Sequence, residues 1–309
     1  PHMRRLGAAT ALMRQAVLDS VEGGHPLSML YPANFEVYHR MGYEIAVQHI
    51  TLKASTKAMA NIKSGTRTVP FTDDHFPRAK ELRRDFHARY NGNVDPSEAR
   101  WKTRLDDEVS RMERFAFFSG DRMVAYLFFK PFKLPASPTK GYVRDYAAAD
   151  SEGLKAILAF LGRYSSMVNN AYVYGDCNDP LMSMLDERAF ELDDNEEFML
   201  RICDVESALA QRGYPEHVKA KVAFKVTDDL VKKNNDTFVL SVERGRGEVT
   251  RAEVDGALQI DVRALAQLYA CFFSAEALQL LGKLSGDSRQ VTAANSIFAG
   301  ERAWVSDMF

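Results

Sequence analysis

The feature that most constrains this chain lies at its beginning, where a turn of small residues leads directly into an amphipathic helix. Arg4-x-x-Gly7-x-Ala9 opens a run, residues 8–21, in which apolar side chains recur at helical spacing. The first amides of a helix lack partners within it, and the helix dipole favours negative charge at that end. Gly7 and the alanines allow a ligand close to the backbone, and two arginines add positive charge. The turn is therefore predicted to bind a pyrophosphate.

A strand and a second, shorter helix are predicted to follow this turn. Residues 26–31 are typical of a buried strand, and residues 34–43 of a short helix that ends at Gly42. With the R-x-x-G-x-A turn, this order resembles the second half of a GNAT acetyltransferase domain. The chain resembles acetyltransferases of the enhanced intracellular survival type at Arg4, Arg5, Gly7, Pro26-Leu27-Ser28 and Tyr38-x-Arg40-x-Gly42-Tyr43, and in ending on Phe309.

This resemblance implies an α/β (α+β) protein in which two GNAT-like domains precede a sterol-carrier-protein-like domain. Residues 1–55 are expected to form the C-terminal half of the N-terminal catalytic GNAT domain, residues 56–213 a central GNAT-like domain, and residues 214–309 the sterol-carrier-like domain. A length of 309 residues agrees with two or three small domains. Because a GNAT domain needs strands and helices ahead of its pyrophosphate loop, the chain is expected to be the later part of a longer protein.

The central part shows GNAT-like order without the cofactor turn. After a predicted linker, residues 54–70, and a helix, residues 78–91, residues 114–129 form two apolar runs about a Gly-Asp turn, which predicts a hairpin. Strand, helix and strand are predicted at residues 141–147, 151–169 and 171–174. Where the first domain has arginines, this one has Asp150 and Glu152, which would repel a pyrophosphate. We therefore expect a degenerate GNAT domain that binds no acetyl donor.

The last third predicts a strand group followed by helices, an order that resembles a sterol-carrier domain. The strands are expected at residues 222–227, 237–243 and 248–251, and the helices at 261–269 and 274–284. The apolar helix faces are explained as core, so a lipid-binding role is the weaker alternative. The terminal segment, residues 295–309, carries enough apolar mass, with Trp304 and Phe309, to predict that it docks rather than frays.

The resemblance assigns roles in acetyl transfer from acetyl-CoA to an amine. The predicted pyrophosphate-binding residues are Met3, Arg4, Arg5, Gly7, Ala8 and Ala9, and Asn34 is expected to contact the pantetheine arm. The terminal carboxylate of Phe309, ionised at neutral pH, is the candidate base for the ammonium proton, and the Tyr38 phenol, protonated at neutral pH, the candidate donor to the departing thiolate. Direct transfer through a ternary complex is expected. The implied acceptors are aminoglycosides, polyamines or lysine side chains.

The composition of the chain limits which partners and which location in the cell can be expected for it. A net charge of −2 makes no case for nucleic acid or a membrane surface, and no targeting segment is visible. Cys177, Cys203 and Cys271 lack metal-ligand spacing and are expected to be reduced, packed thiols of a cytoplasmic protein, or one secreted without a classical signal. Asp73-Asp74-His75 favours helix capping over a metal site, so no metal is expected. The resemblance implies a homo-oligomer, a hexamer in that family. The alternative class is a non-catalytic lipid-carrier or assembly protein.

Overall fold

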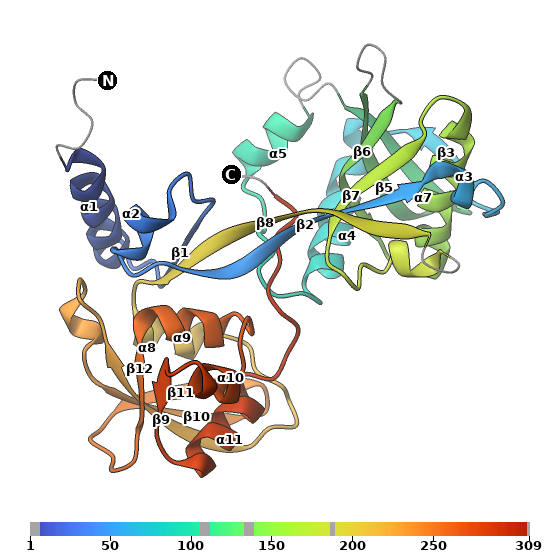
Figure 1. Ribbon diagram of the computed structural model, residues 1–309. Coiled ribbons are helices and arrows are strands. Elements are labelled where there is room, and N and C mark those ends of the chain that lie inside the picture. Colours follow the sequence, from blue (N-terminus) through green and yellow to red (C-terminus); the bar gives the residue numbers. More distant parts are fainter. Residues whose placement is uncertain (1–6, 106–111, 133–138, 186–188, 308–309) are drawn as a thin grey trace. The chain divides into compact units, whose positions relative to one another are not determined.

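The computed structural model describes residues 7–105, 112–132, 139–185 and 189–307. The chain divides into two compact units (Figure 1). Unit 1 contains residues 1–47 and 197–303, and unit 2 contains residues 48–196 and 304–308. Two long strands, β2 (Glu44–Ser55) and β8 (Phe190–Ile202), each begin in one unit and end in the other. None of the described helices is both long and apolar enough to cross a membrane.

The start of unit 1 contains the elements that the sequence predicts. Helix α1 (Ala8–Glu22), strand β1 (Leu27–Leu30) and helix α2 (Phe35–His39) follow in order. Strand β1 pairs antiparallel with β8, so that Leu27 lies opposite Ile202. Side chains of α1, of the α2–β2 connection and of β8 share a small core with Val231 from the last third of the chain: Val17, Met41, Tyr43, Met199 and Val231.

The rest of unit 1 is a five-stranded sheet with helices, in the strand order β11-β10-β9-β12-β13. Its helices are α8 (Val205–Gln211), α9 (Val262–Tyr269), α10 (Ala275–Leu280) and α11 (Ser288–Ile297). Its strands are β9 (Ala220–Thr227), β10 (Thr237–Glu243), β11 (Arg246–Arg251), β12 (Leu258–Asp261) and β13 (Leu284–Ser285). The predicted strand group is confirmed, whereas β12, which pairs parallel with β9, was not predicted.

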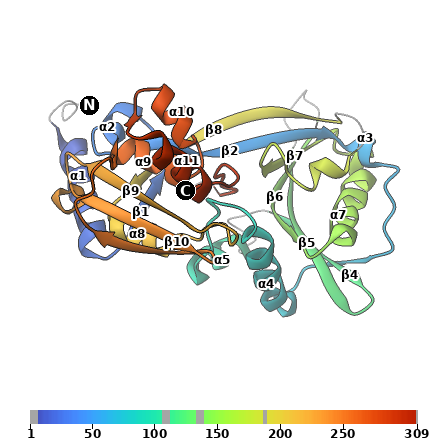
Figure 2. The same cartoon turned by 90° about the horizontal axis from the view of Figure 1, so that it is seen from below.

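Unit 2 is an α/β unit in which a sheet in the order β2-β7-β6-β5-β4-β3 is covered on both faces. Its further strands are β3 (Arg67–Pro70), β4 (Glu113–Ser119), β5 (Arg122–Phe132), β6 (Lys140–Ala148) and β7 (Asn170–Gly175). Its helices are α3 (Thr56–Met59), α4 (Phe76–His87), α5 (Glu98–Leu105) and α7 (Ser151–Arg163). Helices α4 and α7 lie on opposite faces (Figure 2). Single-turn 3₁₀ helices occur in both units, at Asp73–His75, Tyr164–Ser166, Met182–Met184 and Lys232–Asn234.

Some local predictions are wrong. The predicted linker at residues 54–70 contains α3 and the edge strand β3, which pairs with β4. Helix α5 was not predicted, although its Trp101 is buried in the core of unit 2. The expectation of packed thiols holds for Cys203 but not for Cys177, which is exposed. The predicted hairpin of β4 and β5 about Gly120 and Asp121 is confirmed.

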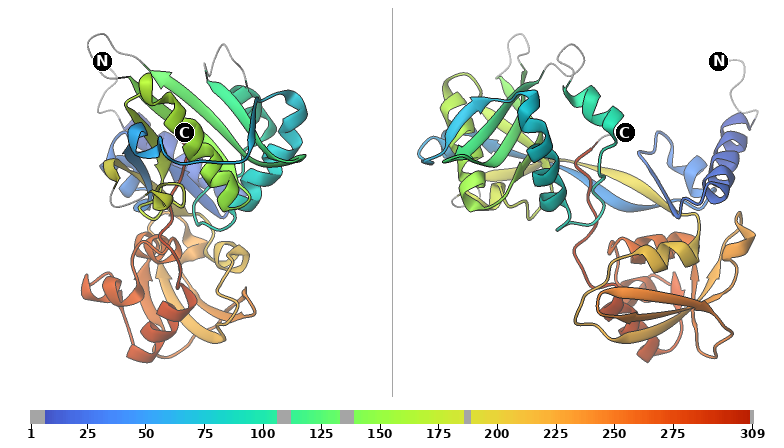
Figure 3. Two further views of the ribbon diagram at one scale, coloured as in Figure 1. Left: turned by 90° about the vertical axis from the view of Figure 1, so that its right-hand side faces the viewer. Right: turned by 180° about the vertical axis from the view of Figure 1, so that it is seen from behind.

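The terminal segment docks, as its apolar residues predict: residues 295–303 belong to unit 1, and residues 304–307 pack on unit 2. Trp304 is 2% exposed and Val305 is completely buried. The Val305 amide donates to the Gln48 carbonyl at 2.9 Å, and the Trp304 amide donates to the Asn91 carbonyl at 3.0 Å. Figure 3 shows the red segment beside the teal chain that connects α4 to α5. Phe309 lies outside the described residues.

Candidate active site

Helix α1 begins at a glycine. Gly7 is the N-cap residue, with φ of +78°, a left-handed conformation that favours glycine. No side chain in the described part of the chain caps this helix, and its first turn holds no acidic residue. The amides of Ala8 and Ala9 thus begin the helix without a side-chain acceptor. Met3, Arg4 and Arg5, the other predicted phosphate-binding residues, lie outside the described residues.

Helix α2 carries the other two predicted site residues that the structure describes. Asn34 is its N-cap, and the side-chain oxygen accepts a hydrogen bond from the Val37 amide at 3.4 Å. Tyr38 is half-buried at the edge of the small core, with its ring 6.1 Å from that of Tyr43 in an edge-to-face arrangement. Within the described part of the chain the Tyr38 hydroxyl makes no hydrogen bond. It is therefore available to donate to a ligand.

A buried ion pair lies beside the backbone that follows α2. The Arg201 guanidinium on β8 donates from one nitrogen to both carboxylate oxygens of Asp228, at 2.9 and 2.6 Å, and both side chains are buried. Gly42 has φ of +84°, and a Cβ atom there would lie 2.8 Å from the Arg201 guanidinium carbon. The backbone therefore passes so close to this cation that only glycine fits, which explains the glycine at the end of the predicted helix.

Helix α9 of the last third binds the end of α2 and the beginning of β2. The Arg263 guanidinium donates to the His39 carbonyl at 2.9 Å, and the Gln267 amide donates to the Ile45 carbonyl at 3.0 Å. Helix-end carbonyls such as that of His39 have no partner within their own helix, so the arginine satisfies one. Sequence reasoning missed both residues because more than 200 positions separate each from its partner.

In unit 2, the N-terminus of α7 is capped by a side chain. The Asp150 carboxylate caps α7, accepting from the amides of Glu152 and Gly153, each at 3.1 Å. Arg122 pairs with the same carboxylate at 2.9 Å. Burial alone would raise the pKa of Asp150, but the Gly153 amide and Arg122 hold it below its ordinary value. An ionised carboxylate already occupies the position that a phosphate would take.

No metal centre emerges from the described residues, which contain no group of three or more His, Cys, Asp or Glu side chains able to hold an ion. The Asp73-Asp74-His75 stretch instead forms a capped 3₁₀ turn. The Thr72 backbone amide donates to the Nδ1 atom of His75 at 2.9 Å.

Three regions of the chain match known domain families. Residues 1–46 and residues 92–202 match two acetyltransferase (GNAT) domain families. Residues 205–306 match the sterol carrier protein domain family. No protein with a curated function matches the chain.

Solved structures resemble the whole chain. The GCN5-related N-acetyltransferase from Anabaena variabilis is 28% identical with a TM-score of 0.93, and the match covers 100% of this chain and 79% of that one. The GCN5-related N-acetyltransferase from Kribbella flavida is 24% identical, with a TM-score of 0.85 and coverage of 100% and 77%. Eis1 from Mycobacterium abscessus is 23% identical, with a TM-score of 0.78 and coverage of 100% and 80%, and it shares the fold.

These matches show which domains the chain contains. The chain combines GNAT acetyltransferase domains with a C-terminal sterol-carrier-like domain, in a mixed α/β fold. Together with the similarity to the Anabaena N-acetyltransferase, they support an acyltransferase. The GNAT family uses acetyl-CoA as co-substrate and acts on amine acceptors.

Proposed function

We propose that this protein transfers the acetyl group of acetyl-CoA directly to a primary amine of a broad set of acceptors: aminoglycosides, polyamines or lysine side chains. One contrast supports the proposal. Of the two GNAT helices that could bind a pyrophosphate, α7 is capped by Asp150, whereas α1 begins at Gly7 with no side-chain cap among the described residues. Only the first helix start therefore offers amides to a phosphate.

The proposed chemistry uses one acid and one base. The acceptor amine, after losing a proton to the Phe309 carboxylate, attacks the thioester carbonyl carbon, and the carbon–sulfur bond breaks as the amide forms. The departing sulfur takes the proton of the Tyr38 hydroxyl, which has no hydrogen-bond partner in the described part of the chain. The second proton, which the nitrogen loses as the amide forms, restores this hydroxyl, and the Phe309 carboxyl group releases its proton to water. Asn34, which caps α2, is also proposed to contact the pantetheine arm.

Coenzyme binding can be tested by imitating the closed helix start. Ala9→Asp places a carboxylate in the first turn of α1, where it stabilises the helix but competes with phosphate. Calorimetry should show that the variant binds coenzyme A at least about tenfold more weakly than wild type does. Its thermal stability should not fall. The matched control is Ala16→Asp, which adds the same charge at an exposed position further along the same helix and should leave affinity within about twofold.

The catalytic roles need a second experiment, measured as coenzyme A thiol release with a polyamine, an aminoglycoside and a lysine peptide. Tyr38→Phe should lower turnover and spare coenzyme binding, and deletion of Phe309 should lower turnover with all three amines. Tyr31→Phe, on an exposed side chain, is the control. Unchanged rates in both variants would remove these roles. Absence of coenzyme binding by the full-length protein would favour a lipid-carrier or assembly protein.

We also propose the domain limits and the oligomeric state. The domain limits are proposed as residues 1–55, 56–213 and 214–309, and the assembly as a cytoplasmic homo-oligomer, a hexamer by resemblance. Native mass spectrometry of the intact protein tests the oligomer.

A further inference from the structure

Helix α2, which carries the proposed proton donor Tyr38, is too short to fix its own position. It is five residues long, and none of these five described residues is buried. A helix of this length is not stable by itself in water. The Asn34 side chain caps its N-terminus by accepting from the Val37 amide at 3.4 Å, a long hydrogen bond. The position of the phenol therefore depends on what holds the other end of α2.

The last residue of α2 is held by an arginine of helix α9. The Nε atom of Arg263 donates to the carbonyl of His39, the residue directly after Tyr38, at 2.9 Å. The other two guanidinium nitrogens pair with Asp261 at 3.0 Å and with Asp229 at 3.4 Å. Asp261 is itself the N-cap of α9. The guanidinium is thus braced at the start of α9, with one N–H group directed at α2.

The same carbonyls belong to the turn that ends α2. The Tyr38 carbonyl accepts from the Met41 and Tyr43 amides, at 2.9 and 3.2 Å, and the His39 carbonyl accepts from the Gly42 amide at 3.0 Å. The arginine therefore binds the peptide unit next to Tyr38 inside a hydrogen-bonded turn. A shift of that peptide unit would carry the phenol with it.

A second side chain of α9 holds the chain a few residues further on. Gln267, one helical turn after Arg263 and 3% exposed, donates from its side-chain amide to the Ile45 carbonyl at 3.0 Å. Lys283 donates to the side-chain oxygen of Gln267 at 3.3 Å, which orients the amide, and pairs with Glu44 at the same distance. Helix α9 therefore binds the backbone on both sides of the turn between α2 and β2.

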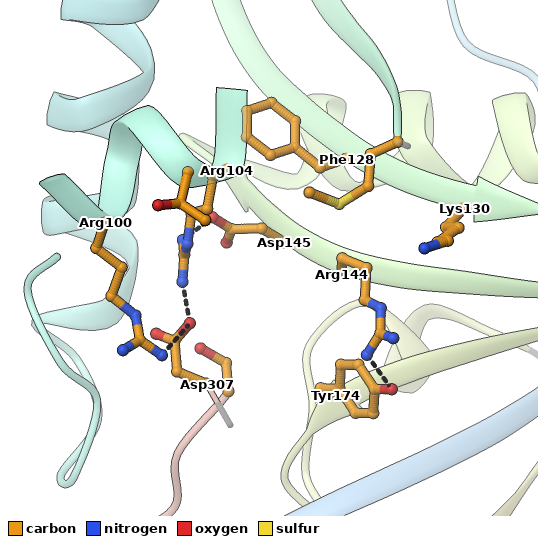
Figure 4. A pocket seen from close by; sticks show the side chains of 11 residues that line it. Arg100, Arg104, Phe128, Lys130, Arg144, Asp145, Tyr174 and Asp307 are labelled. Carbon is orange, nitrogen blue, oxygen red and sulfur yellow. Dashed lines mark hydrogen bonds and ion pairs between the residues drawn. The ribbon is translucent and has the colours of Figure 1, made fainter. Parts of the chain in front are cut away.

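Arg263 differs from an arginine that only balances buried acids. In unit 2, Arg104 gives its side-chain hydrogen bonds to two carboxylates, those of Asp145 and Asp307 (Figure 4). Arg263 instead directs one of its N–H groups to a backbone carbonyl at the end of a helix. A bond from a charged donor to such a carbonyl restrains the last turn of the helix.

We propose that Arg263 and Gln267 are positioning residues for the Tyr38 phenol, so that the sterol-carrier-like domain takes part in acetyl transfer by holding α2. This inference rests on the proposed role of Tyr38 as proton donor. Neither α9 side chain takes part in proton transfer, and each acts through the backbone that carries the phenol. The donor must meet the departing sulfur at hydrogen-bond distance, and a displacement of about 1 Å can lower turnover by about a hundredfold. The domain thus has a role in the reaction that needs no bound lipid.

Turnover of the full-length protein, measured as coenzyme A thiol release with a polyamine, tests the positioning. Arg263→Met keeps an apolar stem and removes the hydrogen bonds, and Gln267→Leu does the same at similar size. We expect Arg263→Met to lower kcat by about tenfold or more and Gln267→Leu by a smaller factor. The KM for the amine and the affinity for coenzyme A should stay within about twofold. Arg263→Lys, which keeps the charge, should retain part of the turnover.

Arg251→Met is the matched control in the same domain. Arg251 also pairs with two carboxylates, Glu206 at 2.9 Å and Asp236 at 3.2 Å, and also donates to a backbone carbonyl, that of Lys233, at 3.3 Å. These partners lie outside residues 34–45. The control should therefore leave kcat within about twofold.

A double variant separates positioning from a general loss of structure. Because Arg263 is proposed to act through the phenol, Arg263→Met should lower kcat by no more than about twofold once Tyr38→Phe is present. An equal loss with and without the phenol would overturn the positioning role, as would an equal kcat in Arg263→Met and Arg251→Met. If Arg263→Met does not fold, Arg263→Lys and Gln267→Leu carry the same comparison, and full turnover in both would overturn the role.

The failure of this inference is distinguishable from the failure of the proposed function. Full turnover in Tyr38→Phe alone would refute the proton donor itself, and with it the positioning. A loss in Tyr38→Phe together with full turnover in Arg263→Met and Gln267→Leu would refute only the positioning.

Discussion

His87 should make unit 2 less stable in acid. Its imidazole, near the end of α4, is 8% exposed, and neither ring nitrogen has a hydrogen-bond partner in the described part of the chain. The ring centre lies 5.9 Å from that of Trp304. Burial first, and then the charges of Arg83 and Arg104 against the opposing Asp307, lower the pKa of His87 from 6.5 to about 3.

The sign and size of the effect follow from proton linkage. Because the pKa is lower in the folded protein, the unfolded chain binds the proton first as the pH falls. The contribution of His87 to stability is present above pH 6.5 and is lost progressively as the pH falls toward about 3. Each pKa unit corresponds to about 1.4 kcal/mol. Lowering the pH from 7.5 to 4.5 should therefore cost about 3 kcal/mol of unfolding free energy.

The test compares wild type with His87→Leu in urea unfolding at pH 7.5 and pH 4.5. Both tryptophans of the chain, Trp101 and Trp304, lie in unit 2, so their fluorescence reports the unfolding of that unit. Leucine fills similar space and removes two unsatisfied nitrogens, so the variant should match or exceed wild type by about 1 kcal/mol at pH 7.5. At pH 4.5 its advantage should grow by about 3 kcal/mol.

Parallel stability curves for wild type and His87→Leu would refute this reasoning, because they would mean that His87 titrates alike in the folded and unfolded chains. His217→Leu is the control, since His217 is exposed and lies in unit 1. It should leave the pH dependence of the fluorescence transition unchanged.

Two further buried carboxylates give predictions of their own. Burial raises the pKa of Asp179 to about 6, although the Tyr146 hydroxyl donates to it at 2.7 Å, so its contribution to stability is present below pH 3.8 and is lost as the pH rises through about 6. Asp179→Asn should therefore gain about 3 kcal/mol relative to wild type between pH 3.5 and 7, and a constant difference in the fluorescence transition would contradict this. In unit 1, Asp228→Asn leaves the buried Arg201 charge unpaired and should cost about 3–5 kcal/mol in unfolding followed by circular dichroism. The double variant with Arg201→Met should recover part of that loss. If the double variant lost as much unfolding free energy as Asp228→Asn alone, the result would argue against the ion pair.

Local signals predicted much of the fold. The helix at residues 8–22 follows from small residues and apolar spacing, and the hairpin at Gly120 and Asp121 from two apolar runs about a turn. Both depend on residues close together in the chain, which is why sequence reasoning found them. The closed start of α7 was also predictable, because Asp150 stands directly before the helix that it caps.

Elements stabilised by distant partners were missed. Residues 67–70, at the end of the predicted linker, form β3 because they pair with β4. Strand β12, four residues long, is a strand because β9 lies beside it in parallel. In both cases the pairing partner, rather than the propensity of the segment, decides the structure.

The same distinction applies to the functional residues. The order of residues along the chain was enough to predict an anion-binding helix start at Gly7, with a phenol on the next helix, because each depends on a few consecutive residues. Those roles stay predictions until Tyr38 and Phe309 are tested. The buried ion pairs of unit 2 could not be foreseen. Asp145 and Asp307 lie 62 and 224 positions from Arg83 in the chain, and only the packing of α4, β6 and residues 304–307 brings these three side chains together.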